Sequence, residues 1–265
     1  MSRRDEIGGS HPRRSRIGFV VWISRRAWLR LLSAAVLLVL ACAVLSTEVP
    51  ASKTWSFWTT PLTGKVIALD AGHGGVDGGA SSRDGVIEKD INLAIALYLR
   101  DYLQQAGALV YLTREGDYDL ASEGVRGYSK RKTEDLKARV KTIQERKADL
   151  VVSIHLNSVP SSKWSGAQTF YYSGSKEGQR LATILQKEIT ESLGNTNRTA
   201  ITNDKVYLLN SLTMPTALVE IGFLSHPEES RLLADETYQK KVAASLYRGI
   251  LRYSSGEGLS SKARS

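Results

Sequence analysis

The sequence predicts a single α/β domain whose mixed, mostly parallel β-sheet is covered by helices on both faces, preceded by a membrane-targeting segment. From residue 65 onward, short apolar runs rich in β-forming residues alternate with amphipathic helical patterns, and this alternation is typical of such a sheet. The first apolar run ends in a glycine-rich segment, DAGHGG at residues 70–75. A histidine therefore lies at the carboxyl end of a strand, where open α/β sheets bind their ligands.

The net charge of +9 is concentrated at the amino end of the 265-residue chain. Residues 1–30 hold eight arginines against Asp5 and Glu6, so they carry +6 of the total. Because the remaining chain is only mildly basic, this surplus indicates the charged flank of a targeting segment and not a nucleic-acid-binding face. We therefore expect no nucleic-acid partner.

Residues 31–46 form the predicted signal or transmembrane segment. Its fifteen-residue apolar run, LLSAAVLLVLACAVL, has a length between that of a signal-peptide core and that of a full membrane span. Arginines precede this run and none follows soon after it, which predicts export of the rest of the chain to the outer side of the cytoplasmic membrane. Cleavage near Ala41-Cys42-Ala43, lipidation at Cys42 and retention as an anchor all stay open, as does the export route.

The linker, the domain and the tail follow in that order. Residues 47–64 carry Pro50, Pro61 and many serines and threonines without periodicity, which indicates a linker. The domain is expected over residues 65–253, and residues 254–265 are expected to be a disordered tail. The predicted strands of the domain are residues 65–70, 108–113, 149–154, 167–172, 206–209 and 216–221.

Helices are predicted between these strands from apolar stripes of helical period. The predicted ranges are residues 88–106, 135–147 and 179–193, one helix from Pro227, and residues 240–253. Ser225 and Glu228 have the spacing of a capping box at the start of the fourth helix.

Polar residues gather at the predicted strand ends. His73 follows the first strand, His155 follows the third, and Glu220 ends the last, while Glu88 opens the helix after the glycine loop. Two imidazoles and one carboxylate form a ligand set that Zn²⁺ accepts with a fourth position left for water, and a second carboxylate can serve as general base. The single cysteine, Cys42, excludes both an intramolecular disulfide and a cysteine-based metal cage.

These residues also have plainer interpretations. His155 fits a hydrogen-bonded core histidine, and Glu88 fits a helix N-terminal acid that the helix dipole favours. The chain has no HExxH motif, so spacing alone does not identify a metal site. From the residues alone, a metal hydrolase and a purely structural cluster stay about equally open.

Four segments resemble the zinc-dependent N-acetylmuramoyl-L-alanine amidases, in the order found in that family. They are DAGHGGVDGG at residues 70–79, EKDINL at 88–93, SIHLN at 153–157 and VEIGFLS at 219–225. The resemblance covers residues 66–251 and implies a six-stranded mixed sheet flanked by helices on both faces. It also implies cleavage of the amide bond between the lactyl group of N-acetylmuramic acid and L-alanine in peptidoglycan.

The resemblance assigns roles to individual residues. It implies that His73, Glu88 and His155 hold one Zn²⁺ per chain, and that Glu220 takes a proton from water and delivers it to the leaving amine. Asn157, which follows a ligand, and Arg114, which ends the second strand, are weaker candidates for substrate contacts. Both also fit structural roles.

KWSGAQTFY at residues 163–171 and VYLLN at 206–210 resemble the spore-cortex, germination-specific branch of the family more narrowly. This branch implies a role in cortex maturation and muramic-lactam formation, on the cortex side of the forespore. Two positions depart from the family pattern, because Gln144 and His226 stand where asparagine is common. We interpret His226 as a helix-start residue rather than a fourth ligand.

Other function classes have weaker support. Another zinc peptidase or amidase of the cell envelope is the nearest competitor. A non-catalytic, membrane-tethered glycan-binding protein would be expected to have lost a ligand or the catalytic carboxylate, and all four residues are present. Nucleotide binding through the glycine loop is also disfavoured, because the spacing of its glycines matches neither the Rossmann nor the P-loop pattern. The expected partners are peptidoglycan and, through the N-terminal segment, the membrane; the sequence does not show whether a protein activator is needed.

Overall fold

The computed structural model describes residues 24–46 and 60–258. The chain divides into two units, residues 1–56 and residues 57–265, which are described separately. The predicted basic region before residue 24 and the linker residues 47–59 lie outside the described residues.

The first unit contains helix α1 (Arg25–Ser46). Within the described part of the chain, one helix, over Arg25–Ala43, is long and apolar enough to cross a membrane, and none of that stretch is buried. The helix includes the predicted apolar segment and begins at the last arginines of the basic region. A signal sequence and a membrane anchor both fit this length and composition.

The second unit is built on a six-stranded mixed sheet, as predicted, with the strand order β2-β1-β3-β6-β4-β5. All neighbouring strands run parallel except β4 and β6, which are antiparallel. The strands are β1 (Val66–Ala71), β2 (Leu109–Leu112), β3 (Leu150–Asn157), β4 (Gln168–Tyr171), β5 (Ile201–Thr202) and β6 (Thr216–Phe223).

One predicted strand is wrong. Val206 is the N-cap of the short helix α6 (Tyr207–Ser211), and residues 207–209 lie within that helix. The sixth strand is instead β5, which pairs with β4. A four-residue apolar run fits a buried turn of helix as well as a strand. Here Leu208 and Leu209 are buried while Tyr207 is 41% exposed, a one-sided pattern that a helix packed on the domain satisfies.

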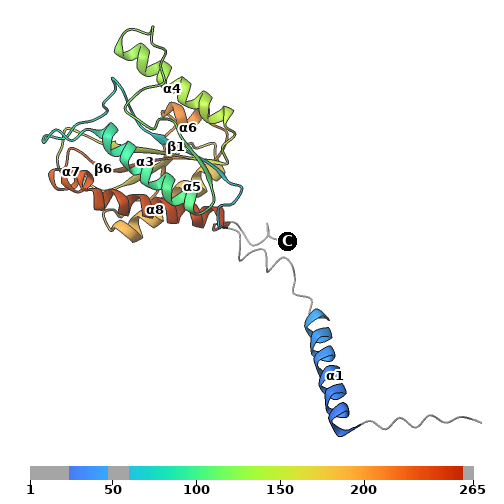
Figure 1. The fold of residues 1–265 in the computed structure, drawn as a ribbon. Coiled ribbons are helices and arrows are strands. Elements are labelled where there is room, and N and C mark those ends of the chain that lie inside the picture. The colour runs from blue at the N-terminus through green and yellow to red at the C-terminus, as the bar shows by residue number, and fades with distance from the viewer. Residues whose placement is uncertain (1–23, 47–59, 259–265) are drawn as a thin grey trace, which may run out of the picture. The chain divides into compact units, whose positions relative to one another are not determined.

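Helices cover both faces of the sheet, as predicted. Helices α3 (Glu88–Gln105) and α5 (Lys176–Leu193) both pack against α8 (Glu236–Ser254) on one face. Helices α4 (Tyr128–Glu145) and α6 lie together on the opposite face (Figure 1). Helix α4 begins seven residues before the predicted start. The prediction began too late because the first turns, YSKRKTE, carry no apolar stripe that marks a helix.

Helix α7 (Pro227–Ala234) begins with a different cap from the one predicted. The N-cap residue is His226, whose Nδ1 accepts a hydrogen bond from the Glu229 amide at 3.2 Å, and Pro227 occupies the first helical position, which suits its fixed φ. Ser225 is not the cap, and its Oγ accepts from the Val159 amide instead. The interpretation of His226 as a helix-start residue is confirmed.

Ordered packing extends beyond both predicted ends of the domain. Leu62, inside the predicted linker, is fully buried, and its amide donates to the Ala106 carbonyl. At the other end, Glu257 accepts hydrogen bonds from the Arg252 side chain.

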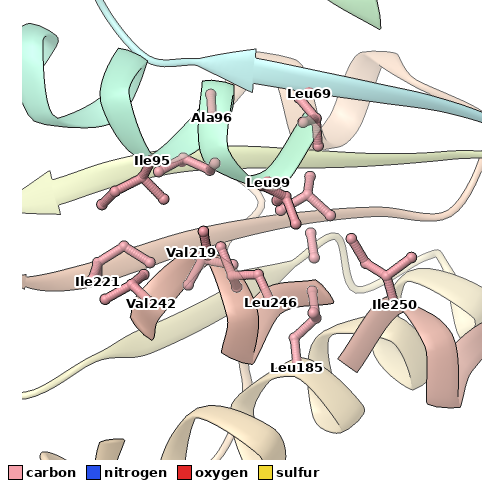
Figure 2. Packing of buried hydrophobic residues seen from close by; sticks show 14 of the residues in the cluster. Leu69, Ile95, Ala96, Leu99, Leu185, Val219, Ile221, Val242, Leu246 and Ile250 are labelled. Atoms are coloured by element: carbon pink, nitrogen blue, oxygen red, sulfur yellow. The ribbon is translucent and has the colours of Figure 1, made fainter. Parts of the chain in front are cut away.

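The main hydrophobic core lies between the sheet and the α3, α5 and α8 helices (Figure 2). Leu99 of α3, Val219 of β6 and Leu246 of α8 are fully buried there. Helices α5 and α8 approach closely at Gly249, where an added Cβ would lie 2.8 Å from Leu185 Cδ2. A smaller apolar cluster fills the space under α4 and α6.

The first testable prediction concerns this core. Leu246→Ala should lower the free energy of unfolding by about 2–5 kcal/mol, because it removes buried methyl groups and leaves a cavity. Denaturant unfolding of the purified protein measures the change. The control Leu232→Ala removes the same atoms from a side chain that is 50% exposed and should change the value by no more than about 0.5 kcal/mol. Equal effects of the two variants would contradict this account of the core.

Candidate metal centre and active site

Three of the sequence-predicted residues converge at the carboxyl ends of β1 and β3. One ligand atom from each of His73, Glu88 and His155 lies within 4.8 Å of the other two. The Glu88 Oε1 atom is 3.2 Å from His73 Nε2 and 3.1 Å from His155 Nδ1. The three side chains come from the glycine loop after β1, the first residue of α3, and the end of β3.

The alternation of side chains along the strands selects the face on which the site lies. Leu69, Val152 and Val219 point into the main core, so their neighbours along each strand point to the α4 and α6 side. Among these neighbours are the polar residues Asp70, Ser153 and Glu220, and His155, which is next to the core residue Ile154, points to the same side.

The Glu88 carboxylate is buried and held by several donors. The Ala80 amide donates to Oε2 at 2.8 Å, and the Leu156 amide donates to Oε1 at 3.0 Å. Burial opposes the charged form, but the hydrogen bonds to His155 and His73 outweigh it and hold the pKa of Glu88 well below its usual range. The residue is therefore an oriented anion, as a metal ligand requires.

His73 is oriented by a second carboxylate. Its Nδ1 lies 2.9 Å from Asp77 Oδ2, which leaves Nε2 to face Glu88. Asp77 is itself bound by the Tyr128 hydroxyl at 2.8 Å and the Lys132 ammonium at 2.9 Å. Burial opposes protonation of His73, but the hydrogen bonds to Asp77 and Glu88 prevail and raise its pKa to about 9.

Two glycines of the loop make room for the cluster. A Cβ on Gly72 would overlap the His155 ring, and a Cβ on Gly79 would lie 2.7 Å from His73 Cδ2. Gly79 also has a φ of 70°, in the left-handed region that favours glycine. The glycine-rich sequence is thus required by close packing against the three side chains.

Glu220 lies beside this cluster on the neighbouring strand. It is the register partner of His155 in the parallel β3–β6 pair. Its Oε2 atom is buried and has no hydrogen-bond partner among the described residues. Burial raises the pKa of Glu220, and the nearby Glu88 charge raises it further, although the two imidazoles oppose the shift.

A cavity of about 400 Å³ opens over these groups. His73, His155 and Glu220 contribute to its floor. Helix α4 contributes the first wall, and residues 205–208, at the start of α6, contribute the second.

Comparison with known proteins places the chain in a family. A profile described as N-acetylmuramoyl-L-alanine amidase matches residues 67–252. The germination-specific N-acetylmuramoyl-L-alanine amidase of Bacillus subtilis is 52% identical over 205 residues, which are 77% of this chain and 86% of that protein. The chain belongs to the N-acetylmuramoyl-L-alanine amidase family.

Solved structures of related amidases agree with this membership. The CwlD amidase of Clostridioides difficile, solved in complex with the GerS lipoprotein, superposes with a TM-score of 0.71 at 44% identity, covering 72% of this chain and 98% of that one. The amidase AmiC2 of Nostoc punctiforme gives a TM-score of 0.62 at 31% identity, covering 74% of this chain and 98% of that one.

The donor set of this amidase fits a zinc ion. Two imidazoles and one carboxylate are a common set of protein ligands in catalytic zinc sites, in which water takes the fourth position. The partnerless Oε2 of Glu220 provides the polar group that such a water needs. His73, Glu88 and His155 are accordingly the residues suited to hold the ion.

Sequence reasoning missed a buried ion-pair network under the glycine loop of the amidase. Arg139 is 1% exposed and contacts Asp70 at 2.8 Å and Asp135 at 2.9 Å. It also donates to the Ala71 and His73 carbonyls. Arg139 lies in a helix whose many basic residues suggest exposure to solvent. Asp70, an acid at the end of a predicted buried strand, was the one sequence feature that indicated a buried cationic partner.

Arg114 does not fit the predicted role in substrate binding. It is 1% exposed, and its guanidinium donates to four backbone carbonyls. They belong to Ala71, Gly72, Lys89 and Gly116. With these bonds Arg114 holds the base of the glycine loop from inside the domain.

The substrate-binding candidate Asn157 and the family-pattern departure Gln144 both lie away from the cavity lining. Asn157 is partly exposed at the end of β3, next to an irregularity in the β3–β6 register, and its substrate contact stays a prediction. Gln144 donates to the Ser211 carbonyl at 3.2 Å and so links α4 to the end of α6, outside the site.

A second prediction tests the close packing of the loop. Gly72→Ala should weaken zinc binding by at least about tenfold, because the new methyl group displaces the His155 ring. Calorimetric titration with zinc measures the loss, and circular dichroism checks that the fold is kept. The control Gly124→Ala adds the same methyl group where nothing lies within 4 Å. Wild-type zinc affinity in Gly72→Ala would contradict the geometry.

A third prediction concerns protonation of the metal-free protein. NMR titration should find a pKa of about 9 for His73, against the ordinary value of 6.5, and Asp77→Asn should lower it. A raised pKa means that His73 stabilises the metal-free fold below pH 6.5 and that this contribution is lost as the pH rises through about 9. Zinc and the proton compete for the same nitrogen of His73, so zinc affinity should rise as the pH rises over the same interval. Titration of His73 near 6.5 would refute the assignment.

Proposed function

We propose that this N-acetylmuramoyl-L-alanine amidase is a zinc hydrolase that cleaves the amide bond between the lactyl group of N-acetylmuramic acid and L-alanine in peptidoglycan. The observation that carries the proposal is the convergence of His73, Glu88 and His155 beside Glu220, whose buried Oε2 has no hydrogen-bond partner in the described part of the chain. The residues proposed as ligands and the residue proposed as catalytic carboxylate thus lie close together, and His73, His155 and Glu220 line one cavity.

His73, Glu88 and His155 would hold the ion, and their own orientations are fixed by neighbouring groups. Asp77 keeps a proton on His73 Nδ1, so that Nε2 presents its lone pair, and the Ala80 and Leu156 amides fix the Glu88 carboxylate. When bound, zinc supplies Lewis acidity, which polarises the scissile carbonyl and lowers the pKa of water toward neutrality.

Glu220 moves the proton. A carboxylate whose pKa is raised by burial accepts a proton from water more readily than an ordinary carboxylate does. Glu220 takes the proton and delivers it to the amide nitrogen of L-alanine, which leaves poorly unless it is protonated. Its burial beside His155 keeps it within the site during both transfers.

The site of action follows from the family and the N-terminal helix. Amidases of this family act on the cell wall, and we propose that α1 directs or anchors the domain outside the cytoplasmic membrane. The 52% identity to a germination-specific amidase favours a role in spore-cortex maturation, with muramic-lactam formation. The similarity to an amidase solved with a lipoprotein also leads us to propose a protein partner in the envelope.

The competing functions are less well supported. Another envelope zinc peptidase shares the metal chemistry, but family membership over residues 67–252 favours the muramoyl amide. A non-catalytic glycan-binding protein does not need a glutamate whose buried oxygen has no hydrogen-bond partner among the described residues beside three ligand candidates.

A fourth prediction separates the two glutamates and tests the proposed function. Glu220→Gln should lower release of stem peptides from peptidoglycan by roughly 10²–10⁴-fold, the usual contribution of a positioned general base. It should keep about one zinc per chain. Glu88→Gln should instead lose zinc, because a neutral amide is a poor ligand for the dication.

Excess zinc distinguishes the two outcomes. Added zinc should partly restore the activity of Glu88→Gln and leave Glu220→Gln inactive. Mass analysis of products and metal analysis of the purified full-length chain provide the two readouts. The opposite pattern of rescue would exchange the two roles, and release of a product cleaved elsewhere in the stem would reject the amidase assignment of the substrate bond.

A further inference from the structure

The cavity over the site carries three cationic side chains, and two of them already have anionic partners. Lys132, Arg139 and Lys205 all contribute to its lining. Arg139 is paired with Asp70 and Asp135, and Lys132 is paired with Asp77. Their charges are therefore largely used in holding the loop.

Lys205 differs from these two cations. It is exposed, and no carboxylate of the described residues forms an ion pair with its ammonium group. Even the adjacent Asp204 is engaged elsewhere, because its two carboxylate oxygens accept from the Ser173 amide at 2.9 Å and the Ser173 hydroxyl at 2.8 Å. The rim of the cavity thus presents one cation without an anion.

The backbone that carries Lys205 is fixed on both sides. The Asn203 amide donates to the Tyr171 carbonyl at 2.9 Å, and the Lys205 amide donates to Asn203 Oδ1 at 3.2 Å. The Asn210 side chain donates to the Asp204 carbonyl at 3.0 Å, which ties the segment to α6. Because little backbone entropy is lost when a ligand binds here, a single lysine can contribute measurably to recognition.

The proposed substrate carries an anion one residue beyond the scissile bond; this step rests on the proposed function. In a peptidoglycan stem, L-alanine is followed by D-glutamate, which is joined to the next residue through its γ-carboxyl group. Its α-carboxyl group therefore stands one residue beyond the scissile amide. It carries a negative charge when free and none when amidated.

We propose that Lys205 binds the α-carboxylate of the second stem residue, and that this contact makes the enzyme prefer stems with a free carboxylate over amidated stems. The ammonium group donates charge-assisted hydrogen bonds to a carboxylate, whereas a neutral carboxamide gives no such Coulombic gain. Because the lysine lies at an exposed rim, water and salt weaken the contact. A preference of about 2- to 5-fold in kcat/KM is expected.

The experiment compares two matched substrates with the full-length chain in detergent. Uncrosslinked glycan strands are polymerised from two lipid-linked precursors that differ only at the α-carboxyl group of the second stem residue, free in one and amidated in the other. Release of the stem peptide gives kcat/KM for each. The wild type should prefer the free acid, and the preference should shrink as the ionic strength rises.

Three variants make the test specific to this side chain. Lys205→Met should bring kcat/KM for the free acid down to the value for the amidated stem, and Lys205→Arg should keep most of the preference. The control Lys241→Met removes the same charge from an exposed lysine on α8 and should keep the full preference.

The outcomes separate this inference from the proposed function. Equal cleavage of both strands by the wild type, or an undiminished preference in Lys205→Met, would overturn the role of Lys205 and leave the amidase assignment intact. Failure to release the stem from either strand would overturn the proposed function and this inference with it.

Discussion

The Glu88 carboxylate joins parts of the chain that are distant in sequence, and the site depends on it. It is 3% exposed, and a buried carboxylate is costly unless donors surround it. Here the Ala80 amide comes from the glycine loop, the Leu156 amide comes from β3, and the Asn92 side chain and the two imidazoles also contact the carboxylate. Satisfying one charge thus fixes the loop, the helix start and the strand end together.

Two buried arginines hold the glycine loop in the conformation that Glu88 requires. Arg114 binds the carbonyls of Ala71 and Gly72, while Arg139 binds those of Ala71 and His73. Backbone carbonyls point to the guanidinium groups, so the imidazole of His73 is left to face the cavity. Rigid support of this kind positions ligands before an ion or a substrate arrives.

The sequence was sufficient where short-range patterns determine the structure. Apolar runs identified five of the six strands, and the polar residues at their ends, His73, His155 and Glu220, marked the face of the site. It was insufficient where long-range contacts decide. A buried Arg114 depends on carbonyls from three separate segments, and the turn at Tyr207 depends on α4 lying above it; neither leaves a local signal.

The same physics gives two glutamates of one site opposite properties. Glu88 accepts bonds from two amides and two imidazoles, so its anionic form is favoured and its pKa falls. Glu220 has a partnerless buried oxygen and a neighbouring negative charge, so its neutral form is favoured and its pKa rises. Pairs of carboxylates whose pKa values are pushed apart divide into a fixed anion and a proton carrier. The residue type does not predict which glutamate takes which role, because the number of donors around each carboxylate is determined by how the strands and the glycine loop pack in the folded domain.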